Sequence, residues 1–156
     1  SYLSGENQIN PQQVFIRGGS AGGYTALAAL AASDCFAAGA SLYGVSDLQA
    51  LCVSTHKFES RYLDWLIGDP KVDHQTYVAR SPVTNAAQIQ CPVIFFQGLM
   101  DRVVPPEQTE LMAQALRANG VTVDVHRYAD EYHGFRDPEV QQEVLELELA
   151  FYQRWL

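Results

Sequence analysis

Residues 14–30 read VFIRGGSAGGYTALAAL. A short, mostly apolar run, Val14 to Arg17, leads into four glycines that surround one serine, Ser20. The run from Tyr24 to Ala32 is rich in helix formers. The first run predicts a strand and the second a helix. The glycines between them allow a sharp turn, because they lack side chains that would collide with the adjoining strand and helix.

Three further segments predict strands. Phe36 to Tyr43 is continuously small and apolar, Pro92 to Gln97 is strongly apolar, and Val121 to Tyr128 alternates. The predicted helices cover His56 to Ile67, Pro106 to Asn119, and a C-terminal helix whose buried face carries Val140, Val144, Leu147 and Phe151. Strands that alternate with helices predict an α/β fold with a mostly parallel sheet of about four strands, flanked by helices. We expect residues 1–156 to form a single domain.

Composition narrows the class of partner. The chain has 156 residues, of which 47% are hydrophobic, and that is enough for one domain with a core. A net charge of −8 repels phosphate backbones, so we expect no nucleic-acid partner. No segment approaches 18 consecutive apolar residues, so we expect no membrane partner. The four histidines do not cluster at metal-ligand spacing, and we expect neither a metal nor a cofactor.

The three cysteines, Cys35, Cys52 and Cys91, are odd in number and form no C-x-x-C pair. Each lies among apolar residues. We therefore expect reduced, mostly buried cysteines and a cytoplasmic location. A cysteine nucleophile is an alternative, although no signature surrounds any of the three.

Polar residues follow three of the predicted strands. Gly18 to Gly22 fits the pattern G-x-S-x-G, Asp101 follows the strand that ends at Gln97, and His133 follows the strand that ends at Tyr128. A serine hydroxyl becomes a nucleophile only when a base is within hydrogen-bond reach and a carboxylate orients that base. The order Ser, Asp, His is typical of α/β-hydrolases.

Each of these residues has a simpler interpretation. Ser20 could cap the following helix, Asp101 could be a turn residue, and His133 could be a loop histidine bound to local carbonyls. The rival carboxylates are Asp47, Asp64, Asp124, Asp130 and Glu131. Asp130 and Glu131 are too close to His133 in sequence to orient it easily. Among the other histidines, His126 lies inside a predicted strand, and His56 and His74 are expected at the surface.

Five segments together resemble the prolyl oligopeptidase family of serine peptidases, nearest to its acylaminoacyl-peptidase and dipeptidyl-aminopeptidase-like branch. They are IRGGSAGGYTALAAL, FAAGASLYGVSDL, KFESRYLDWLIG, CPVIFFQGLMDRVVPPEQ and EYHGF. The resemblance implies an α/β-hydrolase catalytic domain in which Ser20 is the nucleophile, Asp101 the orienting carboxylate and His133 the general base. The backbone N–H of Ala21 would then be one oxyanion donor.

The resemblance also implies a substrate pocket. Its walls would be formed by Val45, Leu48, Val103 and Val104, together with Phe58 and Tyr62. Ordinary core packing is the alternative role for each of them. An apolar pocket would favour short peptides with an apolar or proline-like residue at the cleaved position.

At its N-terminal end, this chain differs from the pattern of the family. Further strands and the second oxyanion donor do not fit before Val14, so we expect a C-terminal fragment of the catalytic domain. In a full-length parent, an N-terminal β-propeller would accompany it. The strand from Val14 to Arg17 would then have an open edge, which favours a homo-oligomer. Alone, the fragment is expected to be weakly active or inactive.

The sequence is also compatible with two other functions. A carboxylesterase-type hydrolase would use the same three residues on esters. A non-catalytic interaction or packing module would retain the residues without assembling them.

Overall fold

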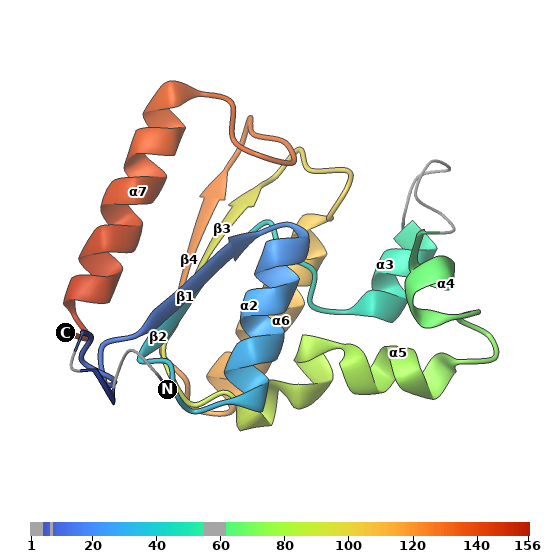
Figure 1. Ribbon diagram of the computed structural model, residues 1–156. Coiled ribbons are helices and arrows are strands. Elements are labelled where there is room, and N and C mark those ends of the chain that lie inside the picture. The colour runs from blue at the N-terminus through green and yellow to red at the C-terminus, as the bar shows by residue number, and fades with distance from the viewer. Residues whose placement is uncertain (1–4, 7, 55–61) are drawn as a thin grey trace.

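A computed structural model describes residues 5, 6, 8–54 and 62–156 (Figure 1). In this part of the chain, four strands form one sheet in the order β1-β2-β3-β4. Their bounds are β1 (Phe15–Gly19), β2 (Ala38–Leu42), β3 (Val93–Gly98) and β4 (Val123–Tyr128). Every neighbouring pair is parallel. The structure thus confirms the α/β fold with a parallel sheet of four strands.

Strand β1 continues beyond its predicted end at Arg17. Gly18 and Gly19 remain paired with β2, where they lie opposite Ser41 and Leu42. The two central strands, β2 and β3, are buried at every residue. Their small and apolar side chains suit strands that are covered on both faces.

Helices cover both faces of the sheet. They are α2 (Ala21–Ala32), α3 (Leu48–Ser54), α4 (Tyr62–Ile67), α5 (His74–Arg80), α6 (Pro106–Ala118) and α7 (Pro138–Gln153), with a 3₁₀ helix, η1 (Pro82–Gln88). Figure 1 shows α2 and α6 on one side of the sheet and α7 on the other. Helices α3, α4 and α5 form a separate group beyond α2 and α6.

The sequence did not predict α3, α5 or η1. Each has only seven residues, too few to show a clear helical period. Helix α4 is the described part of the helix predicted over His56 to Ile67. The remainder of that prediction, from His56 to Arg61, lies outside the described residues.

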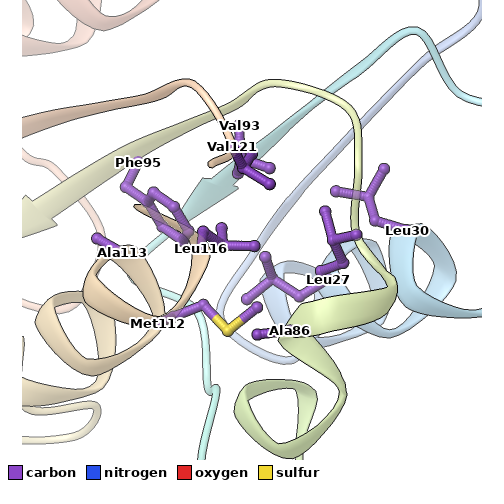
Figure 2. Close-up of a cluster of buried hydrophobic side chains, with 10 residues drawn as sticks. Leu27, Leu30, Ala86, Val93, Phe95, Met112, Ala113, Leu116 and Val121 are labelled. Carbon is purple, nitrogen blue, oxygen red and sulfur yellow. The ribbon is translucent and has the colours of Figure 1, made fainter. Parts of the chain in front are cut away.

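One hydrophobic cluster fixes α2 and α6 against the sheet (Figure 2). Leu27 and Leu30 of α2 meet Met112 and Leu116 of α6 near Phe95 of β3, and each is at most 2% exposed. Burying a side chain of this size contributes about 1.5–3 kcal/mol. This packing fixes α2, and therefore the turn that precedes it.

A second cluster fixes α7 on the opposite face. Val144 and Phe151 of α7 pack with Ile94 and Phe96 of β3, and all four are buried. The edge strand is also tied to α7, because Arg17 Nε donates to the buried Glu148 carboxylate at 2.8 Å. These contacts fix α7 against the sheet along much of its length.

The structure corrects one expectation about the cysteines. All three are free, but Cys35 is exposed, and Cys52 and Cys91 are only partly buried. Cys35 lies in the connection between α2 and β2. No helix in the described part of the chain is long and apolar enough to span a bilayer.

Strand β1 lies at an edge of the sheet. Within the described residues it pairs with β2 alone, so its outer edge has no strand partner. An unpaired edge of this kind can accept a further strand, because its backbone N–H and C=O groups lack strand partners.

Candidate active site

The carboxyl ends of β1, β3 and β4 meet at one edge of the sheet, because all four strands run in the same direction. Ser20 directly follows β1, Asp101 follows β3, and His133 follows β4. Ligands of open α/β sheets bind in the crevice outside this edge.

The turn at Ser20 is strained. Its φ of 56° and ψ of −121° are values that a residue with a side chain rarely adopts. The turn is also tight, since a Cβ atom at Gly18 would lie 2.1 Å from the carbonyl oxygen of Gly22. The Ser20 N–H donates to Leu42 O at 2.9 Å and holds the turn against β2.

The interpretation of Ser20 as a helix cap is wrong. Ser20 occupies the N-cap position of α2, but its side chain makes no capping hydrogen bond. The hydroxyl points instead toward His133, and Ser20 Oγ lies 2.8 Å from His133 Nε2.

His133 bridges the other two residues. Its second ring nitrogen, Nδ1, lies 2.8 Å from Asp101 Oδ2. A carboxylate only accepts hydrogen bonds, so the neutral ring carries its proton on Nδ1 and donates it to Asp101. Nε2 then has a free lone pair, which can accept the proton of the Ser20 hydroxyl.

Asp101 is held rigidly. Its side chain is 0% exposed, and Oδ1 accepts the backbone N–H groups of Val103 and Val104, both at 2.9 Å. Gln97 Nε2 lies 3.5 Å from Oδ2, while Gln97 Oε1 accepts from the Thr109 hydroxyl of α6 at 2.8 Å. Gln97 was not predicted as a site residue, although a polar residue in an otherwise apolar strand is a signal that could have identified it.

An aromatic group packs beside the imidazole. The Tyr43 ring meets the His133 ring edge-on, with centroids 5.0 Å apart, and Phe135 lies 5.3 Å from Tyr43. Tyr43 has a φ of 40°, which turns the chain after β2. Tyr43 was not predicted as a site residue, because only the folded sheet brings it to His133.

A pocket of about 610 Å³ opens beside Ser20. Ala21, Val45, Leu48, Val103 and Val104 line it together with Ser20 and His133. The structure adds lining residues that the sequence did not suggest, which are Tyr24, Leu51, Leu63, Leu66, Ile67 and Arg80. Phe58 and the side chain of Tyr62 lie outside the described residues.

Several residues that line the pocket also belong to a hydrophobic core cluster. Val45, Leu48 and Val104 are each at most 7% exposed and form one cluster with Leu51 and Tyr77. Core packing and pocket lining are therefore compatible roles for these residues. Arg80 also lines the pocket, and its backbone carbonyl accepts the Tyr24 hydroxyl at 3.0 Å.

The rival carboxylates have other surroundings. Asp47 Oδ1 accepts two backbone N–H groups at the start of α3, Asp124 pairs with Arg154, and Glu131 accepts two backbone N–H groups after His133. His126 stacks on Phe96. Among the described residues, no group of three or more histidine, cysteine, aspartate or glutamate side chains could hold a metal ion.

The sequence profile of the prolyl oligopeptidase family (Peptidase_S9) matches residues 1–156. The chain belongs to the prolyl oligopeptidase family. This is a family of serine peptidases, and the α/β-hydrolase fold seen here agrees with its solved members.

Relatives of this chain are themselves peptidases. Dipeptidyl aminopeptidase BIII of Pseudoxanthomonas mexicana is 35% identical over 81% of the chain and 19% of the relative. A puromycin-hydrolyzing peptidase of Mycobacterium tuberculosis is 43% identical with a TM-score of 0.96, over 99% of this chain and 24% of that one. Acylaminoacyl peptidase of Pyrococcus horikoshii is 26% identical with a TM-score of 0.90, over 99% and 26%. The chain thus spans about a fifth to a quarter of the length of these relatives.

Proposed function

We propose that this chain carries the reactive residues of a serine peptidase, with Ser20 as nucleophile, His133 as general base and Asp101 as the orienting carboxylate. The observation that carries the proposal is the unbroken hydrogen-bonded path from Ser20 through His133 to Asp101, with both links at 2.8 Å. Membership of a family of serine peptidases supports the same assignment.

The reaction follows from these contacts. His133 Nε2 takes the hydroxyl proton of Ser20 as Oγ bonds to the carbonyl carbon of the substrate. The imidazolium then gives that proton to the leaving amine as the carbon–nitrogen bond breaks, which leaves an acyl-enzyme. Water, deprotonated by the same nitrogen, attacks the acyl carbon and releases the acid and the free hydroxyl.

Ala21 would stabilise the oxyanion through its backbone N–H. It is the first residue of α2, where an N–H group has no intrahelical acceptor and the helix dipole is positive. Ala21 also lines the pocket beside Ser20.

The pocket favours peptides with an apolar residue at the cleaved position. Its walls are mainly aliphatic and include Val45, Leu48 and Val104, and its volume of about 610 Å³ is typical of a small-molecule site. By their names, the relatives act at dipeptidyl, puromycin and acylaminoacyl groups. We infer short peptides or similar amides as substrates.

The chain is proposed to act within a larger assembly. We infer that residues 1–156 are the C-terminal part of a hydrolase domain whose remaining strands, or a second copy, cover the open edge of β1. A β-propeller that precedes the domain and a cytoplasmic location complete this proposal. The free cysteines fit a reducing compartment.

The decisive experiment combines labelling and turnover. A fluorophosphonate probe should label Ser20, and Ser20→Ala should abolish labelling. Ser33→Ala, an exposed serine at the other end of α2, is the matched control and should label normally. In the full-length protein, peptide p-nitroanilides should be hydrolysed and Ser20→Ala should remove this activity.

Other outcomes would replace the proposal. Turnover of p-nitrophenyl esters without turnover of p-nitroanilides would indicate a carboxylesterase. Absence of labelling in the folded full-length protein would indicate a non-catalytic module. Peptide turnover that survives Ser20→Ala would refute the assigned nucleophile.

A further inference from the structure

Glu131 is a buried carboxylate for which the proposed reaction has no use. It lies between β4 and His133 and is only 5% exposed. Its two oxygens accept backbone N–H groups on the far side of His133, from Arg136 to Oε2 at 2.9 Å and from Asp137 to Oε1 at 2.8 Å. Burying a carboxylate is costly unless its oxygens are hydrogen-bonded, and here both are.

The backbone of Glu131 is tied to the turn that carries Asp101. Its carbonyl oxygen accepts the N–H of Met100, the residue before Asp101, at 2.9 Å. The approach is close enough that a Cβ atom at Gly98 would lie 2.4 Å from this oxygen. One residue therefore connects the Asp101 turn, through its backbone, with the start of α7, through its side chain.

These contacts close residues 131–137 into a loop fixed at both ends. His133 lies inside the loop, and Gly134 has a φ of 83°, which turns the chain back toward α7. Asp137 is the N-cap of α7, so the carboxylate of Glu131 also lies near the positive end of that helix. Since α7 is packed on the sheet, the loop is braced on the fixed core.

We propose that Glu131 is a positioning residue for His133, which holds the imidazole within hydrogen-bond distance of both Asp101 and Ser20. The proposal rests on the proposed function only in that His133 is the base. Glu131 is not the orienting carboxylate of the ring, because Asp101 occupies Nδ1. Glu131 acts on the loop instead, by fixing the position of the His133 backbone from which the imidazole extends.

Glu131→Gln tests this with the smallest change of shape. A glutamine has one side-chain acceptor, so one of the two N–H groups would face its NH₂ donor and lose its partner. Asp130→Asn is the matched control, because it removes one negative charge at the residue that precedes Glu131. Asp130 is exposed, and its side chain makes no hydrogen bond among the described contacts. Glu131→Asp, whose carboxylate is one methylene shorter, is the second variant in case glutamine prevents folding.

Two readouts are measured in the full-length protein. One is turnover of a peptide p-nitroanilide. The other is the far-downfield proton resonance of the Nδ1–H of His133, assigned by its loss in His133→Ala. Unfolding in urea checks that each variant is folded.

We expect Glu131→Gln to lower kcat on the order of 10²-fold without raising KM, since a displacement of about 1 Å in a catalytic group has this effect. The downfield resonance should broaden or vanish, and Glu131→Asp should fall between wild type and glutamine. Asp130→Asn should match wild type. A folded Glu131→Gln or Glu131→Asp with wild-type resonance and kcat would overturn the proposal, as would a rise in KM alone.

The two proposals can fail separately. If Ser20→Ala keeps its turnover, the proposed function is wrong, and Glu131 is then judged by the resonance alone. If Ser20→Ala is inactive while the Glu131 variants behave as wild type, only the positioning role is wrong.

Discussion

Replacing Asp101 by asparagine should disable the site while leaving the fold intact. The asparagine side chain has nearly the same shape as the aspartate it replaces. Its Oδ1 atom can still accept the N–H groups of Val103 and Val104, both at 2.9 Å. Those two bonds fix the amide with its NH₂ group toward His133 Nδ1, where the carboxylate oxygen lies at 2.8 Å.

The consequence is the wrong tautomer of the imidazole. The amide donates to Nδ1, so the ring proton moves to Nε2, where it faces Ser20 Oγ at 2.8 Å. The hydroxyl of Ser20 then has no acceptor for its proton. We expect a loss of about 10⁴ in kcat, equivalent to about 5.5 kcal/mol of transition-state stabilisation.

The assay is turnover of a peptide p-nitroanilide by the full-length protein, together with the rate of Ser20 phosphonylation measured by intact mass. Since both backbone bonds persist, the free energy of unfolding should fall by no more than about 2 kcal/mol. Asp130→Asn controls for the lost charge. A folded Asp101→Asn that works within tenfold of wild type would refute the orienting role.

Three further predictions concern the turn, the core and pH. Gly18→Ala places a Cβ atom 2.1 Å from Gly22 O, so the turn must shift, and fluorophosphonate labelling should slow on the order of 10²-fold; labelling at the wild-type rate would contradict this. Leu116→Ala should lower the free energy of unfolding by about 2–5 kcal/mol in urea, because Leu116 is fully buried, and a loss below about 1 kcal/mol would show that the core relaxes. Burial raises the pKa of Tyr77 to about 12. Because the pKa of tyrosine in the unfolded chain is about 10, this contribution to stability is retained below pH 10 and lost as the pH rises toward 12. Over this range, the free energy of unfolding in urea should therefore fall less for Tyr77→Phe than for wild type. Equal losses would contradict the assignment.

The sequence predicted those features that depend on local pattern. Four apolar runs marked the four strands, and the glycines around Ser20 marked the turn, because each signal lies within a few consecutive residues. Asp101 and His133 could be selected because they follow strands, and the ends of parallel strands meet at one edge.

The features that the sequence could not predict depend on contacts between residues that are distant in the chain. Helix α3 begins where Gln108 of α6 accepts the N–H groups of Ser46 and Asp47, more than sixty residues away in sequence. Gln97, Tyr43 and Glu131 likewise acquire their roles from neighbours that only the folded chain provides. Cys35 was predicted to be buried because its neighbours in the sequence are apolar, but it is exposed in the connection between α2 and β2.

The order of the strands in the sheet is also their order along the chain, and this has a consequence during synthesis. Ser20 leaves the ribosome 113 residues before His133. At roughly 5–20 residues per second, that interval is on the order of ten seconds. Throughout it the serine is an ordinary alcohol, since neither its base nor the loop that places the base has yet been made. If Ser20 is the nucleophile, as proposed, it becomes reactive only after β4 and the loop that carries His133 have been made and have docked on the sheet.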